Sequence, residues 1–387
     1  MSRYLAKRGL SSLVSLLLFL TLMFFVTEVM IPHDFTVQFA MTHNRQQREE
    51  MRHQLGLDLP LWRRYLYWLG RVVRGELGSS LSGPPVVEVL ERMIPFTLIV
   101  FFVGTVIAFL LGQWLGKIVA WRRAHFLTSA ATLSVITLYT SFPPWLAFLV
   151  TYLLTGQMRT YSNIVAEWDS RAWPLSTVML NMVLAIGAVA IAFVVVRKVL
   201  RRIWKRHLPA WLTWLEPPVF VAGVLGGWSV LGFYPQAMSV LRHARLPLLT
   251  YVLLSFGETM LIMRTSMTDT LKETYVTTAR AKGLPERAIR DRHAARNALL
   301  PVLSRLVISI PYLLTGVVIV EQRFNWPGFS GMLFDSFYQQ DMPLVLGGLL
   351  VVGALSAMAR LALDVVYAYL DPRIRYGSPS PQGGWDR

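Results

Sequence analysis

The sequence predicts an all-α protein that crosses a membrane as a bundle of about eight helices, and three observations lead to this fold class. Hydrophobic residues make up 54% of the 387 residues. They gather into long uninterrupted runs instead of alternating with polar residues. Lys and Arg give the chain a formal net charge of +16, and they lie beside these runs without forming a separate basic domain. The charge therefore indicates membrane topology and not nucleic-acid binding.

Each apolar run is close to the roughly 20 residues that a helix needs to cross a hydrocarbon core about 30 Å thick. The runs are residues 10–31, 94–116, 126–155, 173–196, 217–235, 246–263, 298–320 and 342–363. The first run is long and lacks a small-residue cleavage site, so we expect an uncleaved helix instead of a signal peptide. Pro143 and Pro144 interrupt the third run and Pro311 the seventh, which predicts kinks or an opened cavity there.

The basic residues beside the runs predict the orientation of the chain. With both termini inside, the cytoplasmic segments carry most of the Lys and Arg, as the positive-inside rule expects. The clusters are Arg3, Lys7 and Arg8; Lys117, Arg122 and Arg123; and Arg197, Lys198, Arg201, Arg202, Lys205 and Arg206. The Arg-rich residues 33–94 must then lie outside, which is tolerable because long loops are translocated largely regardless of charge.

A short amphipathic helix is expected within this outer segment. In "LWRRYLYWLGRVVRG" the aromatic and aliphatic residues share one helical stripe and the arginines lie largely off it. The stripe is Trp62, Tyr65, Trp68 and Leu69, and the arginines are Arg63, Arg64, Arg71 and Arg74. The pattern suits a helix lying in the membrane interface, and equally a helix packed in a small outer domain.

The sequence carries no pattern typical of catalysis. The chain has no Cys, which excludes disulfides, thiolate catalysis and cysteine metal sites. Its only Gly-Lys pair, Gly116 and Lys117, is followed by Ile118, so it contains no phosphate-binding loop for ATP. The seven His show no metal-ligand spacing, and no Ser lies in a nucleophile elbow. We therefore expect a non-enzyme with no catalytic residue, no metal and no cofactor of its own.

The stretch "TARAKGLPERAIRDRHAARNALLP", residues 278–301, is a polar interruption between two apolar runs. Helix formers run from Lys272 to Lys282, and Gly283 stands where a left-handed residue would end the helix. Pro285 can occupy the first turn of a second helix, with Glu286 complementing its dipole. Small side chains in the first helix would let a partner approach its backbone, although a plain solvated connector would have the same composition.

This stretch resembles the cytoplasmic loop of bacterial ABC-importer inner-membrane permeases of the dipeptide, oligopeptide and nickel transporter family. The matching positions are Tyr275, Val276, Thr278–Leu284, His293–Ala294 and Arg296–Val302. The segments "LRHARLPLLT", "VVIVEQRFNWPGFSGMLFDSF" and "DPRIRYG" resemble further family motifs, and the likeness covers most of the chain outside residues 156–230. The resemblance implies a type I importer architecture for the membrane bundle.

The resemblance also implies a role for the loop, because in this family it forms a coupling helix that docks into a groove on a cytoplasmic ATPase. The expected ATPase-coupling residues are Glu273, Tyr275, Thr278, Ala279, Arg280, Ala281, Lys282, Gly283 and Leu284. Ala279 and Gly283 would be the small residues that allow close packing. Arg280 and Lys282 would make polar contacts at the rim, where charges affect association more than affinity.

The implied assembly lies in the bacterial plasma membrane. It combines this chain with a second homologous permease, two ATPases that use ATP and Mg, and an extracytoplasmic solute-binding protein. The transported solute would be a peptide or a similar molecule, with nickel complexes and oligosaccharides also carried in the family. Two other classes remain as alternatives: a membrane scaffold or enzyme that recruits an unrelated partner, and a secondary transporter, whose internal repeats are not evident here.

The chain departs from the family pattern in three places. Thr277, Thr278 and Ala279 stand where the broader motif reads Glu-Ala-Ala, and the exit of the first helix lacks the family's Pro-Gly-Asp-Pro. Two apolar runs exceed the six helices typical of such permeases. The expected divisions are a first helix in 1–32, an extracytoplasmic segment in 33–93, helices two and three in 94–155, a two-helix insertion with a basic connector in 156–235, a permease core in 236–370 with the coupling loop 269–297, and a flexible tail in 371–387.

Two ionisable residues within apolar runs are candidates for the translocation pathway. Glu258 lies in the run before the coupling loop, and Arg305 lies early in the run after it. Ionisable residues at such depths usually face a bundle interior or water. Each therefore either lines the pathway or pairs with polar groups inside the bundle.

Overall fold

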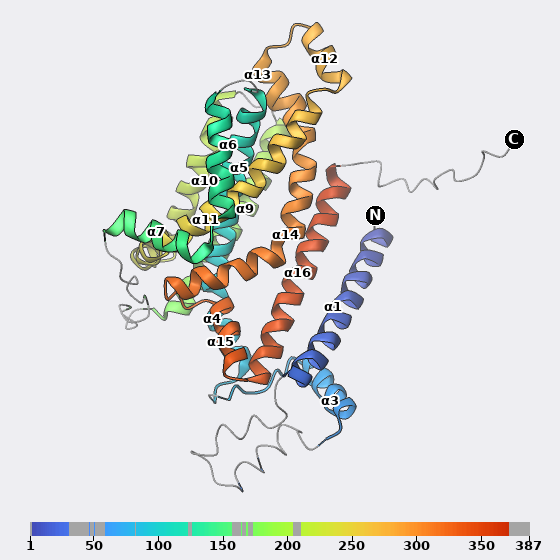
Figure 1. Ribbon diagram of the computed structural model, residues 1–387, viewed down its shortest axis with the longest axis vertical. Helices are drawn as coiled ribbons and strands as arrows, with labels where there is room; N and C mark the ends of the chain where they lie inside the picture. Colours follow the sequence, from blue (N-terminus) through green and yellow to red (C-terminus); the bar gives the residue numbers. More distant parts are fainter. Residues whose placement is uncertain are drawn as a thin grey trace, which may run out of the picture. The chain divides into compact units, whose positions relative to one another are not determined.

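The computed structural model describes residues 2–30, 46, 50, 59–81, 83–122, 126–156, 164, 168, 173–203 and 210–370 (Figure 1). All regular secondary structure in this part of the chain is helical, and its one strand-like pairing is an isolated bridge between Ser79 and Pro85. The all-α prediction is therefore confirmed. The chain divides into two compact units, one of residues 1–87, 299–312 and 336–387 and the other of residues 88–298 and 313–335.

Helices contain most of the described residues of each of the eight apolar runs. Five helices among the described residues are long and apolar enough to cross a membrane, or six if one bent pair is counted as a span. The helices that carry the runs are α1 (Ser2–Met30), α4 (Val86–Leu98) continuing through the π-helical η2 (Ile99–Val103) into α5 (Gly104–Trp121), α6 (Phe126–Thr140) with α7 (Pro143–Thr155), α9 (Leu175–Ile203), α10 (Ala210–Val230), α11 (Tyr234–Thr270), α14 (Ala295–Arg323) and α16 (Met342–Leu370).

The core of the larger unit is the contact between α5 and α11. A stripe of small residues recurs every four positions along α5, and all of its members are buried: Gly104, Ala108, Gly112, Gly116 and Ala120. A methyl group added to Gly112 would lie 2.7 Å from the carbonyl oxygen of Phe256, and one added to Gly116 would lie 2.7 Å from that of Met260. The two backbones therefore touch almost directly, as small residues allow in membrane helix pairs.

The third apolar run forms two helices instead of one. The axes of α6 and α7 differ in direction by 112° across a break at Ser141 and Phe142, and Pro143 begins α7. Proline suits the first turn of a helix because its missing N–H would lack an intrahelical partner there in any case. The kink expected from the two prolines is thus a full change of direction. Leu146 and Val150 on α7 then pack with Val320 near the end of α14.

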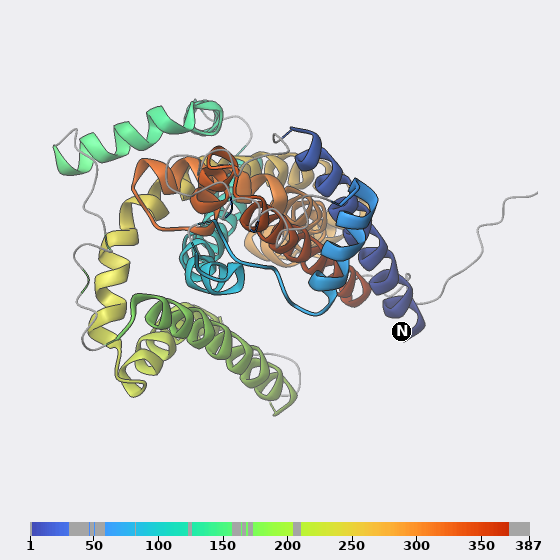
Figure 2. The ribbon, with the colours of Figure 1, turned by 90° about the horizontal axis from the view of Figure 1, so that it is seen from below.

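The two extra apolar runs form α9 and α10, which pack against each other (Figure 2). The rings of Phe193 and Phe220 meet edge to face at 5.9 Å between centroids, and Gly223 faces Val189. Only 17% of the most apolar stretch of α9 is buried, against 56% for α11. The pair therefore presents a wide apolar surface outward. Much of the basic connector, and residues 157–163, lie outside the described residues.

In the smaller unit, α1 packs against α16, where Gly353 faces Leu16 and Phe19. The amphipathic helix expected in the outer segment is α3 (Leu61–Val73), which lies against the end of α1. Asp341, placed just before α16, accepts hydrogen bonds from the Ser80 hydroxyl at 2.5 Å and from the backbone N–H of Leu344 at 3.2 Å. It fixes the start of α16 to the segment after α3. The tail, residues 371–387, lies outside the described residues.

The α5–α11 contact predicts that alanine substitution at two different glycines has very different effects on stability. Gly112→Ala should lower the thermal unfolding midpoint of the detergent-solubilised protein, because the new methyl group overpacks a site that cannot open without separating the helices. Overpacking of this kind costs about 1–3 kcal/mol. Gly187→Ala on α9 is the matched control, since nothing lies within 4 Å of its added Cβ. Equal midpoints for the two variants, measured by scanning fluorimetry, would contradict the packing described for α5.

Candidate functional site

The polar loop contains a short helix, α12 (Thr274–Ala281), which follows the end of α11. Gly283 has φ +71°, the left-handed conformation that was expected to end this helix. The second helix, α13 (Glu286–Ala288), begins one residue later than predicted, because Pro285 is extended and stands just before it. It runs through a π-helical turn, η3 (Ile289–Ala294), directly into α14. Two short helices joined at a glycine are therefore present, as the sequence indicated.

The loop has a buried inner face made of small and aliphatic residues. Val276 on α12 and Ile289 on η3 are fully buried, and Ala279 is 6% exposed. Among the nine predicted ATPase-coupling residues, Ala279 is thus the one that lies inside the chain's own packing. The other eight are exposed: Glu273, Tyr275, Thr278, Arg280, Ala281, Lys282, Gly283 and Leu284. The exposed face of α12 is therefore available to a partner, whereas Ala279 holds the helix to its own protein.

A hydrogen bond joins α12 to the start of α14. The side-chain amide of Asn297 donates to the Tyr275 hydroxyl at 2.8 Å. Tyr275 lies in the first turn of α12 and Asn297 in the first turn of α14, twenty-two residues later in the chain. This contact fixes the beginning of the short helix relative to the membrane helix that follows the loop.

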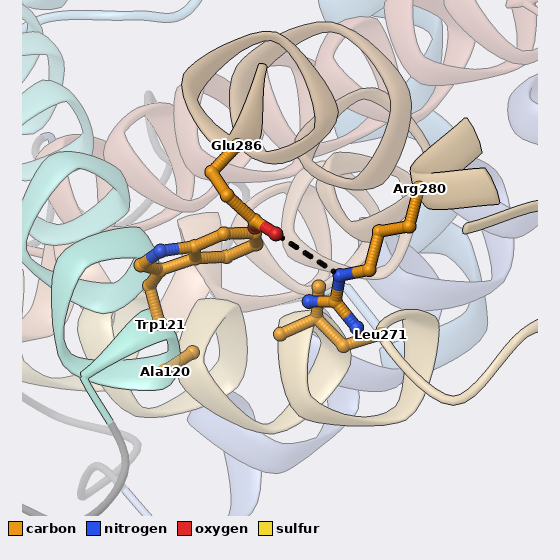
Figure 3. Close-up of a pocket in the computed structure, with 5 residues that line it drawn as sticks. All are labelled: Ala120, Trp121, Leu271, Arg280 and Glu286. Carbon is orange, nitrogen blue, oxygen red and sulfur yellow. Dashed lines mark hydrogen bonds and ion pairs between the residues drawn. The ribbon is translucent and has the colours of Figure 1, made fainter. Parts of the chain in front are cut away.

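A shallow pocket separates α12 from the end of α5, and Figure 3 shows the residues that line it. Arg280 points into the pocket, where its Nε donates to Glu286 Oε1 at 3.2 Å. Its guanidinium carbon lies 5.8 Å from the ring centroid of Trp121, the last residue of α5. Exposed ion pairs and cation–π contacts each contribute only up to about 1 kcal/mol. Their effect here is mainly geometric, because they join α12, α13 and α5 at one point.

One turn earlier on α5, Lys117 makes a second contact with the loop. Its Nζ lies 3.4 Å from Asp291 Oδ1 on η3. Asp291 also accepts two hydrogen bonds from Arg290, at 3.1 and 2.8 Å, and these hold the pKa of the Asp291 carboxyl below its usual value, with Lys117 adding to the effect. Because Lys117 and Trp121 are four residues apart, they lie on the same face of α5. That face is fastened to the loop at two points.

The two pathway candidates lie in different surroundings. Glu258 on α11 belongs to the larger unit and is half-buried, with Thr259 and Met260 beside it in the core. Arg305 on α14 belongs to the smaller unit and is exposed. Their assignment to a translocation pathway stays a prediction.

Among the described residues of the larger unit, the most enclosed carboxylate is that of Glu321 near the end of α14, which was not among the candidates. It is 1% exposed and accepts hydrogen bonds from the Thr97 hydroxyl on α4 and from the backbone N–H of Gly331 at 2.7 Å. The backbone N–H of Ser330 adds a third donor. Burying a carboxylate is expensive unless donors surround it, so this arrangement fixes α14 to α4. An acidic residue at the end of an apolar run was the available signal.

The turn after Glu321 wraps closely around the carboxylate. Trp326 donates its backbone N–H to the Glu321 carbonyl at 2.8 Å and its indole N–H to the Phe96 carbonyl at 3.1 Å. Gly328 passes so near that a methyl group there would collide with the Glu321 side chain. The Trp-Pro-Gly stretch singled out in the sequence is therefore the backbone that encloses this acid before α15 (Phe329–Tyr338) begins.

Comparison with known proteins identifies the family. Residues 104–376 match the family model described as the binding-protein-dependent transport system inner membrane component. The chain belongs to this family. Residues 1–84 match the corresponding N-terminal model of binding-protein-dependent transport membrane components. This permease is therefore a multi-pass integral protein of the inner membrane, and it is a transport component of a larger system.

Several relatives align with the permease along nearly its whole length. It is 32% identical to a putative peptide permease protein of Brucella suis, covering 97% of this chain and 99% of the relative. It is 27% identical to the oligopeptide transport system permease protein AppB of Bacillus subtilis, covering 97% and 100%. It is 26% identical to the dipeptide transport system permease protein DppB of Escherichia coli, covering 95% and 98%. The likeness is therefore not confined to the loop.

The enclosure of Glu321 predicts that two glycines in this permease respond differently to the same substitution. Gly328→Ala should destabilise the protein by about 1–3 kcal/mol, because the methyl group displaces the carboxylate from its donors. Gly331→Ala should be tolerated, since its added Cβ would lie at an ordinary 3.6 Å from Glu321. The measurement is the unfolding midpoint in detergent for both variants. A tolerated Gly328→Ala would show that Glu321 is not held as described.

Proposed function

We propose that this chain is a pathway-forming permease subunit of an ATP-driven importer for peptides. The observation that carries the proposal is the exposed short helix α12, which packs against η3, is joined to α5 by Arg280 and to α14 by Tyr275, and leaves most of its outer face free for a partner. The names of the relatives favour peptides as the transported class. A nickel complex or an oligosaccharide is the alternative cargo.

The proposed assembly contains a second homologous permease, two cytoplasmic ATPases and an extracytoplasmic solute-binding protein. The ATPases supply ATP hydrolysis with Mg, because the sequence of this chain has no phosphate-binding loop. Both termini of the chain lie in the cytoplasm, on the same side as α12. The solute-binding protein delivers the peptide from the opposite side.

The coupling route begins where α12 docks on an ATPase. Movement of α12 reaches α14 through the Tyr275–Asn297 hydrogen bond and reaches α5 through the Arg280–Trp121 contact. The adjoining η3 reaches α5 through the Lys117–Asp291 ion pair. Because α5 lies in direct backbone contact with α11, a displacement of α5 also carries α11. Close-packed interiors transmit such displacements with little compression. Three membrane helices thus respond to one docking helix.

The alternatives are a scaffold that recruits an unrelated cytoplasmic partner and a secondary transporter. Both differ from the importer in what remains bound and in what drives uptake. An importer retains two ATPase chains and a second permease after gentle extraction, and its uptake requires ATP. A scaffold or a secondary transporter would not retain these chains, and ATP hydrolysis would not drive uptake by it.

The coupling role predicts that Gly283→Val separates ATP hydrolysis from transport. A β-branched residue in the left-handed conformation is strained by roughly 1–3 kcal/mol, so the end of α12 must shift. The tagged variant should still reach the membrane and co-purify with its partner subunits. In proteoliposomes it should hydrolyse ATP but take up little peptide per ATP.

The matched control is Gly156→Val, because Gly156 ends α7 with φ +66° and likewise has open space around its added Cβ. This control variant should carry the same local strain, but its ATP hydrolysis should still drive peptide uptake. Normal peptide uptake per ATP by Gly283→Val would count against docking through α12. Recovery of the unaltered chain without any ATPase, from membranes that still take up peptide, would overturn the importer assembly itself.

The fastening of α5 to the loop predicts a smaller effect for Trp121→Ala. Loss of the Arg280 contact should reduce uptake per ATP roughly two- to five-fold, the equivalent of one cation–π interaction. Trp114→Ala, an exposed position two turns earlier on α5, should leave the ratio unchanged. The ratio of peptide taken up to ATP hydrolysed is measured in proteoliposomes. If both variants behave alike, α5 does not take part in coupling.

A further inference from the structure

The helix α3 divides into three faces, one of which is occupied by α1. Tyr65 hydrogen-bonds to Thr21 at 2.7 Å between the hydroxyl oxygens, and its ring stacks on Phe25 at 5.6 Å between centroids. Trp68 packs on Phe24 at 5.2 Å. Arg64, on the same side, forms an ion pair with the buried Glu28. These contacts hold α3 in a fixed orientation against α1, and Figures 1 and 2 show the two helices side by side.

The contacts also determine the depth of α3 along α1. The residues that it touches on α1 all lie between Thr21 and Glu28, which is a length of about 10 Å at 1.5 Å per residue. The candidate span of α1 ends at Glu28. A helix attached there lies beside the last two turns of this span, where α1 approaches the headgroup region.

A second face of α3 is an exposed apolar strip. Trp62, Leu66 and Val73 are 57%, 57% and 80% exposed, and their spacing of four and seven places them along one line of the helix. On α1, Leu22 and Phe25 are exposed at the same level, at 58% and 39%. Because Phe25 also stacks on Tyr65, the strip continues into the apolar surface of a membrane span.

The third face carries exposed basic and amphipathic residues. Arg63, Tyr67 and the C-cap residue Arg74 are exposed, and helical spacing places them next to the apolar strip, on a side of α3 that the contacts with α1 leave open. The guanidinium of Arg63 lies 5.0 Å from the ring centroid of Trp62, so charge and aromatic surface adjoin. An apolar strip beside arginines, with Trp and Tyr at the boundary, is the composition of helices that lie in the plane of a membrane surface.

We propose that α3 lies in the membrane–water interface at the end of α1, where it binds phospholipid. Trp62, Leu66 and Val73 enter the acyl-chain region, and Arg63 and Arg74 contact lipid phosphates. The bilayer is favoured over a protein partner because the strip is continuous with a span whose most apolar stretch is only 11% buried. Through the Glu28–Arg64 pair and Tyr65, the anchored α3 fixes the tilt of α1.

The absence of cysteine makes this placement directly measurable. A single introduced cysteine carries a nitroxide label in the complete transporter, reconstituted in bilayers of phosphatidylethanolamine and phosphatidylglycerol. The strip sites are Trp62→Cys, Leu66→Cys and Val73→Cys, and the flank sites are Arg63→Cys, Tyr67→Cys and Arg74→Cys. Power saturation then compares collisions with oxygen, which concentrates among acyl chains, and with a water-soluble nickel chelate.

Strip sites should collide mainly with oxygen and flank sites mainly with the nickel chelate. Access of the chelate to all six sites would overturn the proposal and indicate a solvated outer domain. Exclusion of both reagents from the strip would overturn it in favour of a protein partner. Each outcome is independent of whether α12 couples to an ATPase.

A lipid-selectivity measurement tests the two arginines. The preference of the protein for spin-labelled phosphatidylglycerol over phosphatidylcholine should fall by roughly fivefold for each of Arg63→Gln and Arg74→Gln. Arg92→Gln is the control, because Arg92 is also exposed but is paired with Glu88 on α4. If a variant with both substitutions, Arg63→Gln and Arg74→Gln, keeps the unaltered preference for phosphatidylglycerol, α3 does not bind lipid phosphates.

Discussion

The line of small residues on α5 brings its backbone against α11, and the rest of the larger unit is arranged around this contact. In a membrane, apolar side chains gain little by leaving lipid for protein, so helices associate mainly where their surfaces fit closely. Gly112 and Gly116 supply that fit. The helix α6 also packs against α11, where Gly257 faces Tyr139. Since α11 leads into the polar loop and α5 ends beside it, this packing also positions the loop.

Buried carboxylates fix the ends of several helices. Glu28 ties α1 to α3, Glu321 ties α14 to α4, and Asp341 ties the start of α16 to the segment after α3. Each acid is bound to a hydroxyl, a guanidinium or backbone N–H groups from elsewhere in the chain. Removing Arg64 would leave Glu28 as an uncompensated buried charge, and removing a donor from Glu321 or Asp341 would leave a buried polar group unsatisfied; both changes are unfavourable. These acids therefore specify which helix ends meet, a task for which apolar packing alone has little selectivity.

In the polar loop, one face of α12 packs against the rest of the protein and another face is exposed. Val276 and Ala279 face the protein, whereas Thr278 and Lys282 remain exposed. Arg280 belongs to both faces, because it is exposed yet already engaged with Glu286 and Trp121. A docking partner that competes for Arg280 would loosen α12 from α5, and one that leaves this contact intact would move the two together. The proposed coupling requires the second arrangement.

The sequence by itself determined the helices and the family. Each of the eight apolar runs predicted helical structure, Gly283 predicted the end of α12, and the loop motif predicted the permease family that the comparisons show. Tertiary packing decided that Pro143 starts a new helix at 112°, that Ala279 faces inward and that Glu321 is the most enclosed of the described acids in its unit. The reason is physical: lipid tails and protein interiors are equally apolar, so hydropathy cannot say which of them covers a residue. Only the packing of segments distant in the chain makes that choice.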